Sequence, residues 1–369
     1  MDTSERNLED LIEQALLAVE PIQTTKASTG SRTREKSTSY HTQNTVTAWE
    51  GITPGGYRKR TSADYDEHLC LIAEDVFTFL YTTQPQEWER FLAQFQGQSD
   101  EARARFLQRL NSEVRQRGTL DVLRRGVKAN GCHFELAYFK PANKLNPELD
   151  TLYKGNIFSV VRQFRYSVNR HAEGKKQNSS SIDLALFLNG LPIFTAELKN
   201  DFKAQTVEDA IEQYKKRDSK EPIFAYGRCL AHFAVDPNYV YMTTHLQGEN
   251  TRFLPFNQGN NGGSGNPPNW KSFATAYLWE RIWAPEVVLD LVHRFIQEVE
   301  EVDDKGRKTG KKYLIFPRYH QLETVRRLIA HARLSHAGQH YLIQHSAGSG
   351  KSNTIAWTAH QLSKGLKKN

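Results

Sequence analysis

The sequence predicts an α/β protein in which a mixed sheet is flanked by helices and the start of a second α/β unit follows. Three observations lead to this prediction. Apolar residues recur three and four apart through residues 64–125, which is the spacing of amphipathic helices. Short runs rich in aromatic and β-branched residues dominate residues 130–245, as in strands. Near the end, a strand-like run enters a glycine loop and a helix-like segment over residues 341–362.

The first predicted element is a helix over residues 4–19, with Ser4 as its cap and an apolar stripe at helical spacing. A basic segment rich in Ser and Thr over residues 21–48 then breaks all periodicity, and we expect a mobile insertion that extends to about residue 60. The elements that follow are helices over 67–81, 87–95, 102–117 and 206–217, and strands over 132–139, 156–167, 181–200, 228–236 and 239–246.

The glycine-rich stretch NQGNNGGSGNPPN lacks a strand–glycine–helix frame, so we interpret residues 257–269 as an irregular surface loop. A helix is expected over 285–302, and the charged run after it reads as a linker. This linker is the predicted domain boundary. The predicted divisions are an N-terminal helix (1–20) that belongs to the first domain, the insertion (21–60), the first domain itself (61–302), and the linker with the start of the second unit (303–369).

The composition bounds the class of protein. The 369 residues carry a net charge of +7, with 38% hydrophobic and 25% charged residues. This charge favours a polyanionic partner such as nucleic acid, although an ordinary basic surface explains it equally well. No run approaches the roughly 18 apolar residues of a membrane helix, and the acidic N-terminus lacks the apolar region of a signal peptide. Cys70, Cys132 and Cys229 match no zinc spacing, so we expect a reducing, cytoplasmic setting.

The hairpin SIDLALFLNGLPIFTAELKN carries three charges on otherwise apolar strands: Asp183, Glu197 and Lys199. A two-residue Asn189-Gly190 turn would place the two carboxylates on opposite faces of the ribbon, because a slip of one residue reverses every side chain. A three-residue loop over 189–191 would place Asp183 opposite Glu197 and bring the leucines together. We therefore predict the three-residue loop, with Gly190 supplying a positive φ.

Two carboxylates held close together repel each other at neutral pH, and a divalent cation removes this repulsion. Mg²⁺ prefers oxygen ligands and keeps several waters, so Asp183 and Glu197 together with a phosphate oxygen suit it. Lys199, two residues along the same face, can orient a water or steady charge that develops on a phosphate. These are the parts for phosphodiester hydrolysis. The alternative is a surface Lys–carboxylate pair worth at most about 1 kcal/mol.

Asp183 followed by Glu197-Leu198-Lys199 resembles the core of the PD-(D/E)xK nucleases, with Ile at position 182 where the family name has Pro. The resemblance implies a restriction-endonuclease-like fold in which these three residues are catalytic. It also implies a supporting helix with Gln and Tyr, for which the adjacent pair Gln213-Tyr214 is the match. An acid from the first helix is implied too. Glu9 is the best match, and an ordinary solvated helix position is the alternative for it.

A second motif, YLIQHSAGSGKS, gives the strand–loop–helix order that a P-loop needs, with a strand expected over 341–344. Backbone N–H groups of the loop would hold phosphates at the helix N-terminus, its lysine would meet phosphate oxygens, and its last serine would bind Mg²⁺. His345 stands where the full pattern has Gly. The residues expected to bind ATP are Gly348, Ser349, Gly350, Lys351, Ser352 and Gln321.

Gln321, about 30 residues before the P-loop lysine, is similar to the adenine-reading glutamine of superfamily 2 helicases. No acidic Walker B pair and no arginine finger follow the loop. The chain is therefore expected to hold only the truncated start of a RecA-like P-loop domain. We expect it to bind ATP without hydrolysing it, and we expect it to be the N-terminal part of a longer protein.

The nuclease hairpin, the N-terminal helical region and FPRYHQ…LIQHSAGSGKS, in this order, resemble the restriction (R) subunit of type I restriction enzymes. Stretches such as TQPQEWERF, LNGLPIFTAELKN and HFAVDPNYVYMTTHL also look familial. The resemblance implies double-stranded DNA as substrate, Mg²⁺ and ATP as cofactors, and methyltransferase (M) and specificity (S) subunits as partners. Two alternatives stay open. One is a repair nuclease fused to a helicase, and the other is an inactive DNA- and ATP-binding assembly fragment.

Overall fold

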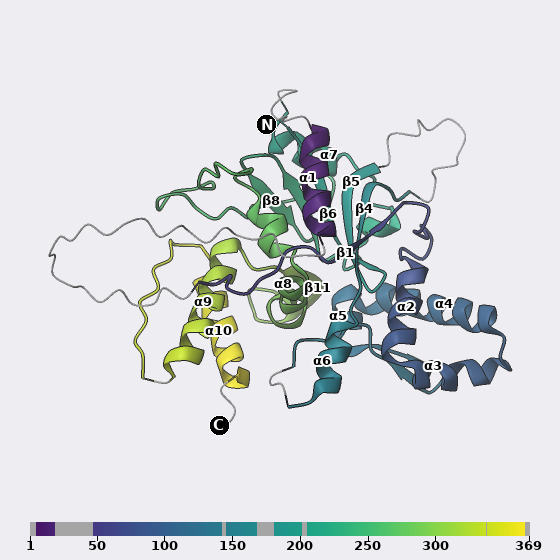
Figure 1. The fold of residues 1–369 in the computed structure, drawn as a ribbon. Coiled ribbons are helices and arrows are strands. Elements are labelled where there is room, and N and C mark those ends of the chain that lie inside the picture. Colours follow the sequence, from purple (N-terminus) through teal and green to yellow (C-terminus); the bar gives the residue numbers. More distant parts are fainter. Residues whose placement is uncertain are drawn as a thin grey trace, which may run out of the picture.

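A seven-stranded mixed sheet forms the centre of the protein, which we describe from a computed structural model (Figure 1). The structure describes residues 5–18, 47–141, 145–167, 181–200, 205–336 and 338–365. The strand order is β1-β4-β5-β6-β7-β8-β9, with β1–β4 and β6–β7 parallel and the other neighbours antiparallel. The strands are β1 (Tyr57–Arg60), β4 (Phe158–Arg165), β5 (Ser181–Leu188), β6 (Leu191–Leu198), β7 (Ala231–Val235), β8 (Val240–Thr243) and β9 (Leu254–Pro255).

Helices surround this sheet, and two hairpins form separate two-stranded sheets. The α-helices are α1 (Glu5–Leu17), α2 (Ala73–Thr83), α3 (Pro85–Leu92), α4 (Ser99–Arg117), α5 (Thr119–Arg125), α6 (Pro147–Lys154), α7 (Val207–Lys215), α8 (Pro285–Asp290), α9 (Tyr319–Ser335) and α10 (Lys351–Gly365). Short 3-10 helices span Ala93–Phe95 and Pro222–Phe224, and π-helical turns span Leu278–Ile282 and Leu291–Phe295. The hairpins are β2 (Val127–Ala129) with β3 (Cys132–Phe134), and β10 (Gln297–Val302) with β11 (Lys308–Ile315).

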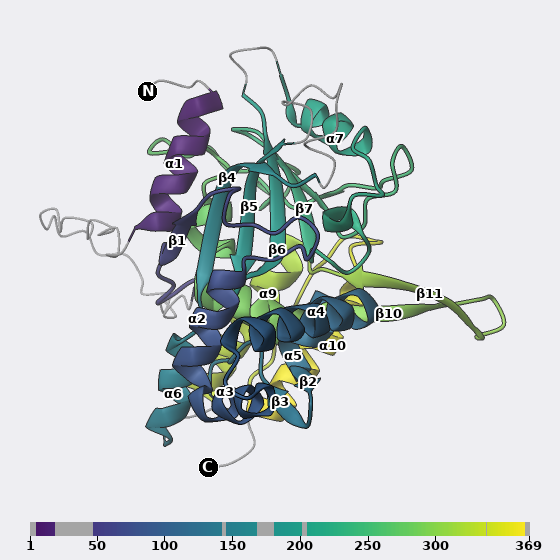
Figure 2. The same ribbon diagram turned by 90° about the vertical axis from the view of Figure 1, so that its right-hand side faces the viewer.

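Helices α1 and α7 lie on opposite sides of the sheet, as Figure 2 shows. The apolar stripe of α1 (Leu8, Ile12 and Leu16) is fully buried in the main core, which also contains Leu186 and Leu198. On the other face, Tyr214 of α7 packs in a second cluster that contains Phe187. Side chains from both helices can therefore reach the ends of the central strands β5 and β6, one helix from each face of the sheet. In the described part of the chain, no helix combines the length and apolarity needed to cross a bilayer.

The helices predicted over 67–81, 87–95 and 102–117 are confirmed, although α2 begins only at Ala73. Residues 67–81, 87–95 and 102–117 correspond to α2, α3 with its 3-10 extension, and α4. Helix α7 lies within the predicted range 206–217, and Thr206 and Asp209 form a capping box at its start. The predicted strand over 132–139 is shorter, since only Cys132–Phe134 pairs. The loop over 257–269 is irregular apart from an isolated bridge, as expected.

Two boundary predictions are wrong. Residues 19–46 lie outside the described residues, but Tyr57–Arg60 forms β1 and pairs with β4, so the insertion does not extend to residue 60. The expected helix over 285–302 and the linker after it are wrong as well. The chain leaves the helix after Phe295 and forms the β10–β11 ribbon, which projects from the body in Figure 2.

Cross-strand ion pairs explain the ribbon. Lys308 Nζ lies 2.8 Å from Glu300 and Lys312 Nζ lies 2.9 Å from Glu298, so the charges read as a linker instead pair across two strands. Each such pair contributes only a few tenths of a kcal/mol to about 1 kcal/mol, but they act together with the backbone ladder. Packing also continues past the expected boundary, because Phe316 belongs to the main core and Trp357 Nε1 donates to the Phe295 carbonyl at 2.8 Å.

The strand predicted over 341–344 is wrong, since these residues have no regular structure and Leu342 is 98% exposed. A strand requires a neighbour to complete its ladder. Among the residues that the structure describes, no strand pairs with this segment. Only the helical half of the expected frame is present, as α10.

The hairpin turn differs from the prediction, yet the predicted register is present. Asn189 (φ 49°) and Gly190 (φ 82°) form a two-residue turn that pairs Leu188 with Leu191. The three-residue loop is therefore wrong. A bulge after Leu186 shifts the pairing by one residue, as the three-residue loop would have done. The ladder then pairs Leu184 with Ala196. Continued by one residue, this register sets Asp183 against Glu197.

The turn has this form because it is buried. The Asn189 side chain accepts from the Ile157 N–H at 2.6 Å and donates to the Leu136 carbonyl at 2.8 Å. The Gly190 carbonyl accepts from the Ile72 N–H at 2.9 Å. These partners fix both turn residues in the left-handed region, which suits Asn and Gly.

Replacing Gly190 by Ala tests how strongly this turn is fixed. A Cβ there would lie 2.5 Å from the Ile72 carbonyl oxygen and 2.6 Å from Val76 Cγ2, at a φ of +82°. We expect Gly190→Ala to lower the free energy of unfolding by about 3 kcal/mol, through backbone strain and overpacking. Gly306→Ala is the matched control, because Gly306 has φ +73° with nothing within 4 Å. It should lose about 1 kcal/mol. Equal losses in urea unfolding would contradict the account.

Candidate active site

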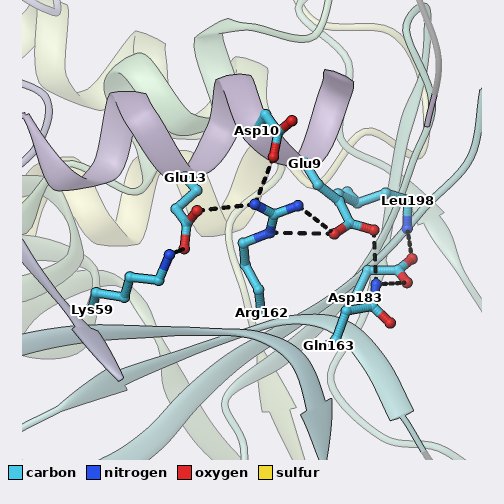
Figure 3. Close-up of polar contacts among 8 residues, drawn as sticks. All are labelled: Glu9, Asp10, Glu13, Lys59, Arg162, Gln163, Asp183 and Leu198. Atoms are coloured by element: carbon cyan, nitrogen blue, oxygen red, sulfur yellow. Dashed lines mark hydrogen bonds and ion pairs between the residues drawn. The ribbon is translucent and has the colours of Figure 1, made fainter. Parts of the chain in front are cut away.

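The ladder between β5 and β6 ends at Leu184 and Ala196, and the candidate site lies where the two strands part. Beyond this point a side chain replaces the backbone acceptor, because Asp183 Oδ2 accepts from the Leu198 N–H at 2.7 Å (Figure 3). Asp183 Oδ1 accepts from Gln163 Nε2 at 3.3 Å. The Asp183 carboxylate is therefore oriented by both flanking strands while it stays partly exposed.

Glu197 lies next to Asp183 and is fully buried. Its Oε1 accepts from Arg217 Nη2, whereas its Oε2 is buried and no described residue forms a hydrogen bond with it. Burial raises the pKa of Glu197 to about 8, with Arg217 opposing the rise and the Asp183 charge adding to it. The site therefore holds two interacting carboxylates, and one oxygen of Glu197 has no partner within the described part of the chain.

Lys199 follows directly after β6. Its backbone N–H donates to the Val235 carbonyl of β7 at 2.8 Å, and the residue is only 7% exposed. The Lys199 charge also acts on Glu197, whose pKa it lowers. Asp183, Glu197 and Lys199 thus lie at the same end of the central strands β5 and β6, close enough for their charges to interact.

Glu9 of α1 reaches this edge from the other face. Its Oε1 accepts from Gln163 Nε2 at 2.8 Å, and the same amide binds Asp183 (Figure 3). Burial raises the pKa of Glu9, with the Asp183 charge adding to the rise and Arg162 opposing it. Glu9 is 6% exposed, so the alternative of an ordinary solvated helix position is wrong. Gln163 can join the two carboxyls because it lies at an irregular point of β4 with φ 45°.

Arg162 fixes α1 on the sheet. Its guanidinium donates to Glu9 at 3.0 Å, to Asp10 at 2.6 Å and to Glu13 at 2.9 Å, and Lys59 adds an ion pair to Glu13 at 3.0 Å. These carboxylates raise the pKa of Arg162 against the opposing effect of burial, so it stays charged. The first helix is therefore held by charge as well as by its apolar stripe (Figure 3).

The two predicted residues of α7 have different surroundings. The Tyr214 hydroxyl is buried and lies 2.8 Å from Thr195 Oγ1, which lies 2.7 Å from His232 Nδ1. These hydrogen bonds lie behind the site, since Thr195 is two residues before Glu197 on β6. Gln213 is half-buried on the same helix. Tyr214 thus fixes α7 against β6, and the catalytic roles assigned to both residues stay predictions.

Arg217 contacts the site directly, and the sequence reasoning missed it. Arg217 lies two residues after Lys215, the last residue of α7, so the helical pattern gave no signal for it. Charge spacing on one helix does not show which carboxylate the arginine will meet, and that depended on the sheet.

The donor set fits a small cation that prefers oxygen. Asp183 and Glu197 provide carboxylates, and Glu197 Oε2, which has no hydrogen-bond partner among the described residues, is available to a cation. Within the described ranges, no group of three or more His, Cys, Asp or Glu side chains is arranged to hold a metal ion. Mg²⁺ matches two carboxylates completed by water and substrate oxygens, whereas structural zinc needs four protein ligands.

The glycine loop lies at a second location. Gly348 (φ 70°) and Gly350 (φ 80°) precede α10, which begins with the exposed residues Lys351 and Ser352. The backbone of Gly348, Ser349 and Gly350 borders a pocket of about 380 Å³ that strands β8 and β11 also line. The location allows a phosphate to approach the loop, and ATP binding there stays a prediction.

Gln321 of α9 braces this loop. Its Nε2 donates to the Ser349 carbonyl at 3.1 Å and to the Gly350 carbonyl at 2.9 Å, while its Oε1 accepts from the Arg318 N–H at 2.8 Å. Both ends of the amide are thus engaged with backbone groups. Contact with an adenine would require these bonds to be exchanged, so the adenine-reading role stays a prediction.

With this geometry established, comparison with known proteins identifies the family. Residues 2–251 match the family model described as the type I restriction enzyme R protein N terminus. The chain belongs to this family. The match includes the carboxylates, Lys199 and Arg217 of the candidate site, whereas Gln321 and the glycine loop lie beyond it.

A relative supports this placement among the R proteins. A Methanocaldococcus jannaschii protein, provisionally named the endonuclease subunit of the type I restriction enzyme MjaVIIIP, is 28% identical over 214 residues. These residues are 55% of this chain and 18% of that protein. The chain therefore matches less than a fifth of the length of that R-protein relative.

The buried histidine behind the site predicts a pH dependence of stability. Burial lowers the pKa of His232 to about 3, whereas an unfolded histidine titrates near 6.5. Between these values the unfolded state binds the proton and the folded state does not, so stability falls as pH falls. From pH 7.5 to 5.0 this residue should remove about 2 kcal/mol.

The measurement is urea unfolding of His232→Gln at both pH values. The variant should lose about 2 kcal/mol less than the parent over this interval, whatever its stability at pH 7.5. His340→Gln is the matched control, since His340 is exposed, and it should keep the parental slope. A parental slope in His232→Gln would contradict the assignment of a neutral buried imidazole.

Proposed function

We propose that this chain is the DNA-cleaving part of a type I restriction enzyme R subunit and hydrolyses phosphodiester bonds with a PD-(D/E)xK site. The observation that carries the proposal is the parting of β5 and β6 at Leu184 and Ala196, where Asp183, Glu197 and Lys199 gather. Family membership favours restriction over the alternative of a repair nuclease. The name of the M. jannaschii relative points to the same chemistry.

The proposed reaction is in-line attack of water on a DNA phosphate. Mg²⁺ bound by Asp183 and Glu197 would supply a Lewis acid for the phosphoryl oxygens. Asp183 is held for this role by the Leu198 N–H, and Glu197 by Arg217. Lys199 positions or activates the attacking water and stabilises the negative charge that develops in the transition state. Glu9, joined to Asp183 through Gln163, adds a carboxyl from the first helix.

The C-terminal segment would bind ATP at its glycine loop and join the nuclease to a motor. Gly348, Ser349 and Gly350 would hold phosphates, Lys351 would pair with them, and Ser352 would bind the accompanying Mg²⁺. In the full enzyme this site would couple cleavage to ATP-driven DNA translocation, with M and S subunits as partners. The net charge of +7 suits double-stranded DNA.

A second candidate is a fragment that binds DNA and ATP without cutting. It is favoured by residues 341–344, which have no strand neighbour in the described part of the chain. If cleavage requires a complete motor, this unit would not support it. A plasmid assay with Mg²⁺ separates the two candidates, because binding without cutting by the chain alone favours the second.

Replacing Lys199 by Ala tests the nuclease assignment. We expect DNA cleavage by the complete enzyme to fall about 10²–10³-fold, because one group that stabilises transition-state charge is lost. DNA binding and ATP hydrolysis by the complex should persist. Lys216→Ala is the matched control, since Lys216 is an exposed lysine at the end of α7. Parental cleavage rates in Lys199→Ala would end this assignment.

Replacing Lys351 by Ala tests the nucleotide site. Removing a charge-assisted contact to phosphate should weaken binding of a fluorescent ATP analogue by about 10- to 100-fold. Lys311→Ala, at an exposed position on the β10–β11 ribbon, should bind the analogue as the parent does. Unchanged affinity in Lys351→Ala would remove ATP from the proposal and leave the nuclease site untouched.

A further inference from the structure

Arg217 occupies the gap that opens where β5 and β6 part. Its Nη2 donates to the Ser181 carbonyl of β5 at 2.6 Å and also to Glu197 Oε1 of β6. The backbone ladder ends before these residues, at Leu184 and Ala196. One guanidinium therefore joins the ends of two strands that no longer pair with each other.

The orientation of this guanidinium is fixed from several directions. Nη1 donates to the Tyr166 hydroxyl at 2.8 Å. The guanidinium carbon lies 5.4 Å from the centre of the Tyr166 ring and 5.9 Å from that of Tyr214. The side chain is only 5% exposed. The contacts with Tyr166, Tyr214 and the Ser181 carbonyl fix the position of the Arg217 guanidinium. The Glu197 carboxylate is therefore oriented by the guanidinium.

Arg217 thereby divides the two oxygens of Glu197. Oε1 accepts from the guanidinium, whereas Oε2 is buried and has no hydrogen-bond partner in the ranges that the structure describes. A buried carboxylate oxygen without a partner is costly. This cost is explained if Oε2 binds a ligand next to Asp183, at the end of strands β5 and β6.

We propose that Arg217 is a positioning residue that holds Glu197 Oε1 so that Oε2 is presented to a divalent cation shared with Asp183. The inference rests on the proposed function, because it concerns the same site. Ligands of metal ions are themselves commonly fixed by hydrogen bonds from neighbouring residues, and loss of such a bond costs 10- to 100-fold in metal affinity. A guanidinium serves this purpose better than an ammonium group, because its planar fork reaches Tyr166, Ser181 and Glu197 at once.

The test measures cation binding directly rather than cleavage. The full chain, without nucleotide, is titrated with Mn²⁺, and free Mn²⁺ is followed by electron paramagnetic resonance, with Mg²⁺ as competitor. We expect Arg217→Gln to weaken Mn²⁺ affinity about 10- to 100-fold. Arg217→Lys should weaken it by less, since it keeps the charge but loses the fork. Lys216→Gln, its exposed neighbour, should bind as the parent does.

Asp183→Asn separates this inference from the proposed function on which it rests. If Asp183→Asn binds Mn²⁺ as tightly as the parent, the carboxylate site itself is wrong. If Asp183→Asn loses Mn²⁺ while a folded Arg217→Gln keeps parental affinity, only the role of Arg217 is overturned. Circular dichroism establishes that each variant is folded. Should Arg217→Gln not fold, Arg217→Lys decides, and parental affinity there overturns the positioning role.

Discussion

The structure depends on the point at which the β5–β6 ladder stops. Up to Leu184 and Ala196 the two strands satisfy each other through their backbones. Beyond it, the Asp183 carboxylate accepts from the Leu198 N–H, and Arg217 donates to the Ser181 carbonyl. Buried backbone groups must find partners, so these charged side chains complete the sheet. Where these side chains replace the backbone ladder, Asp183, Glu197 and Lys199 come together at the end of the two strands.

Charges buried at this edge stay there because each face of the sheet supplies a guanidinium. Arg162 meets the acids of α1 on one side, and Arg217 meets Glu197 on the other. Removing either partner would leave a buried carboxylate uncompensated, which costs several kcal/mol in comparable pairs. The site is thus held by carboxylates that are paired with guanidinium groups on both faces of the sheet. Carboxylates attract a divalent cation, which would in turn offset their repulsion of an anionic phosphodiester.

The C-terminal segment belongs to the same folded body. Leu314, Phe316 and Trp357 pack in the main core, and the β10–β11 ribbon replaces the flexible linker that the charges suggest. The pocket beside the glycine loop is lined by β8 of the large sheet as well as by the loop. The seven-stranded sheet and the glycine loop therefore line the same pocket.

The sequence by itself determined the amphipathic helices, the capped α7, the charged hairpin and membership of the R-protein family, because these depend on local spacing and on residue order. It did not determine the bulge after Leu186, the ribbon at 297–315, the unpaired segment at 341–344 or the role of Arg217. Each of these depends on which partner is available in space. A buried turn required Asn189 and Gly190 to pack against α2 and its neighbours, and a bulge then restored the register. Arg217 meets Glu197 only because two strands part beside α7, and no pattern within the helix records that.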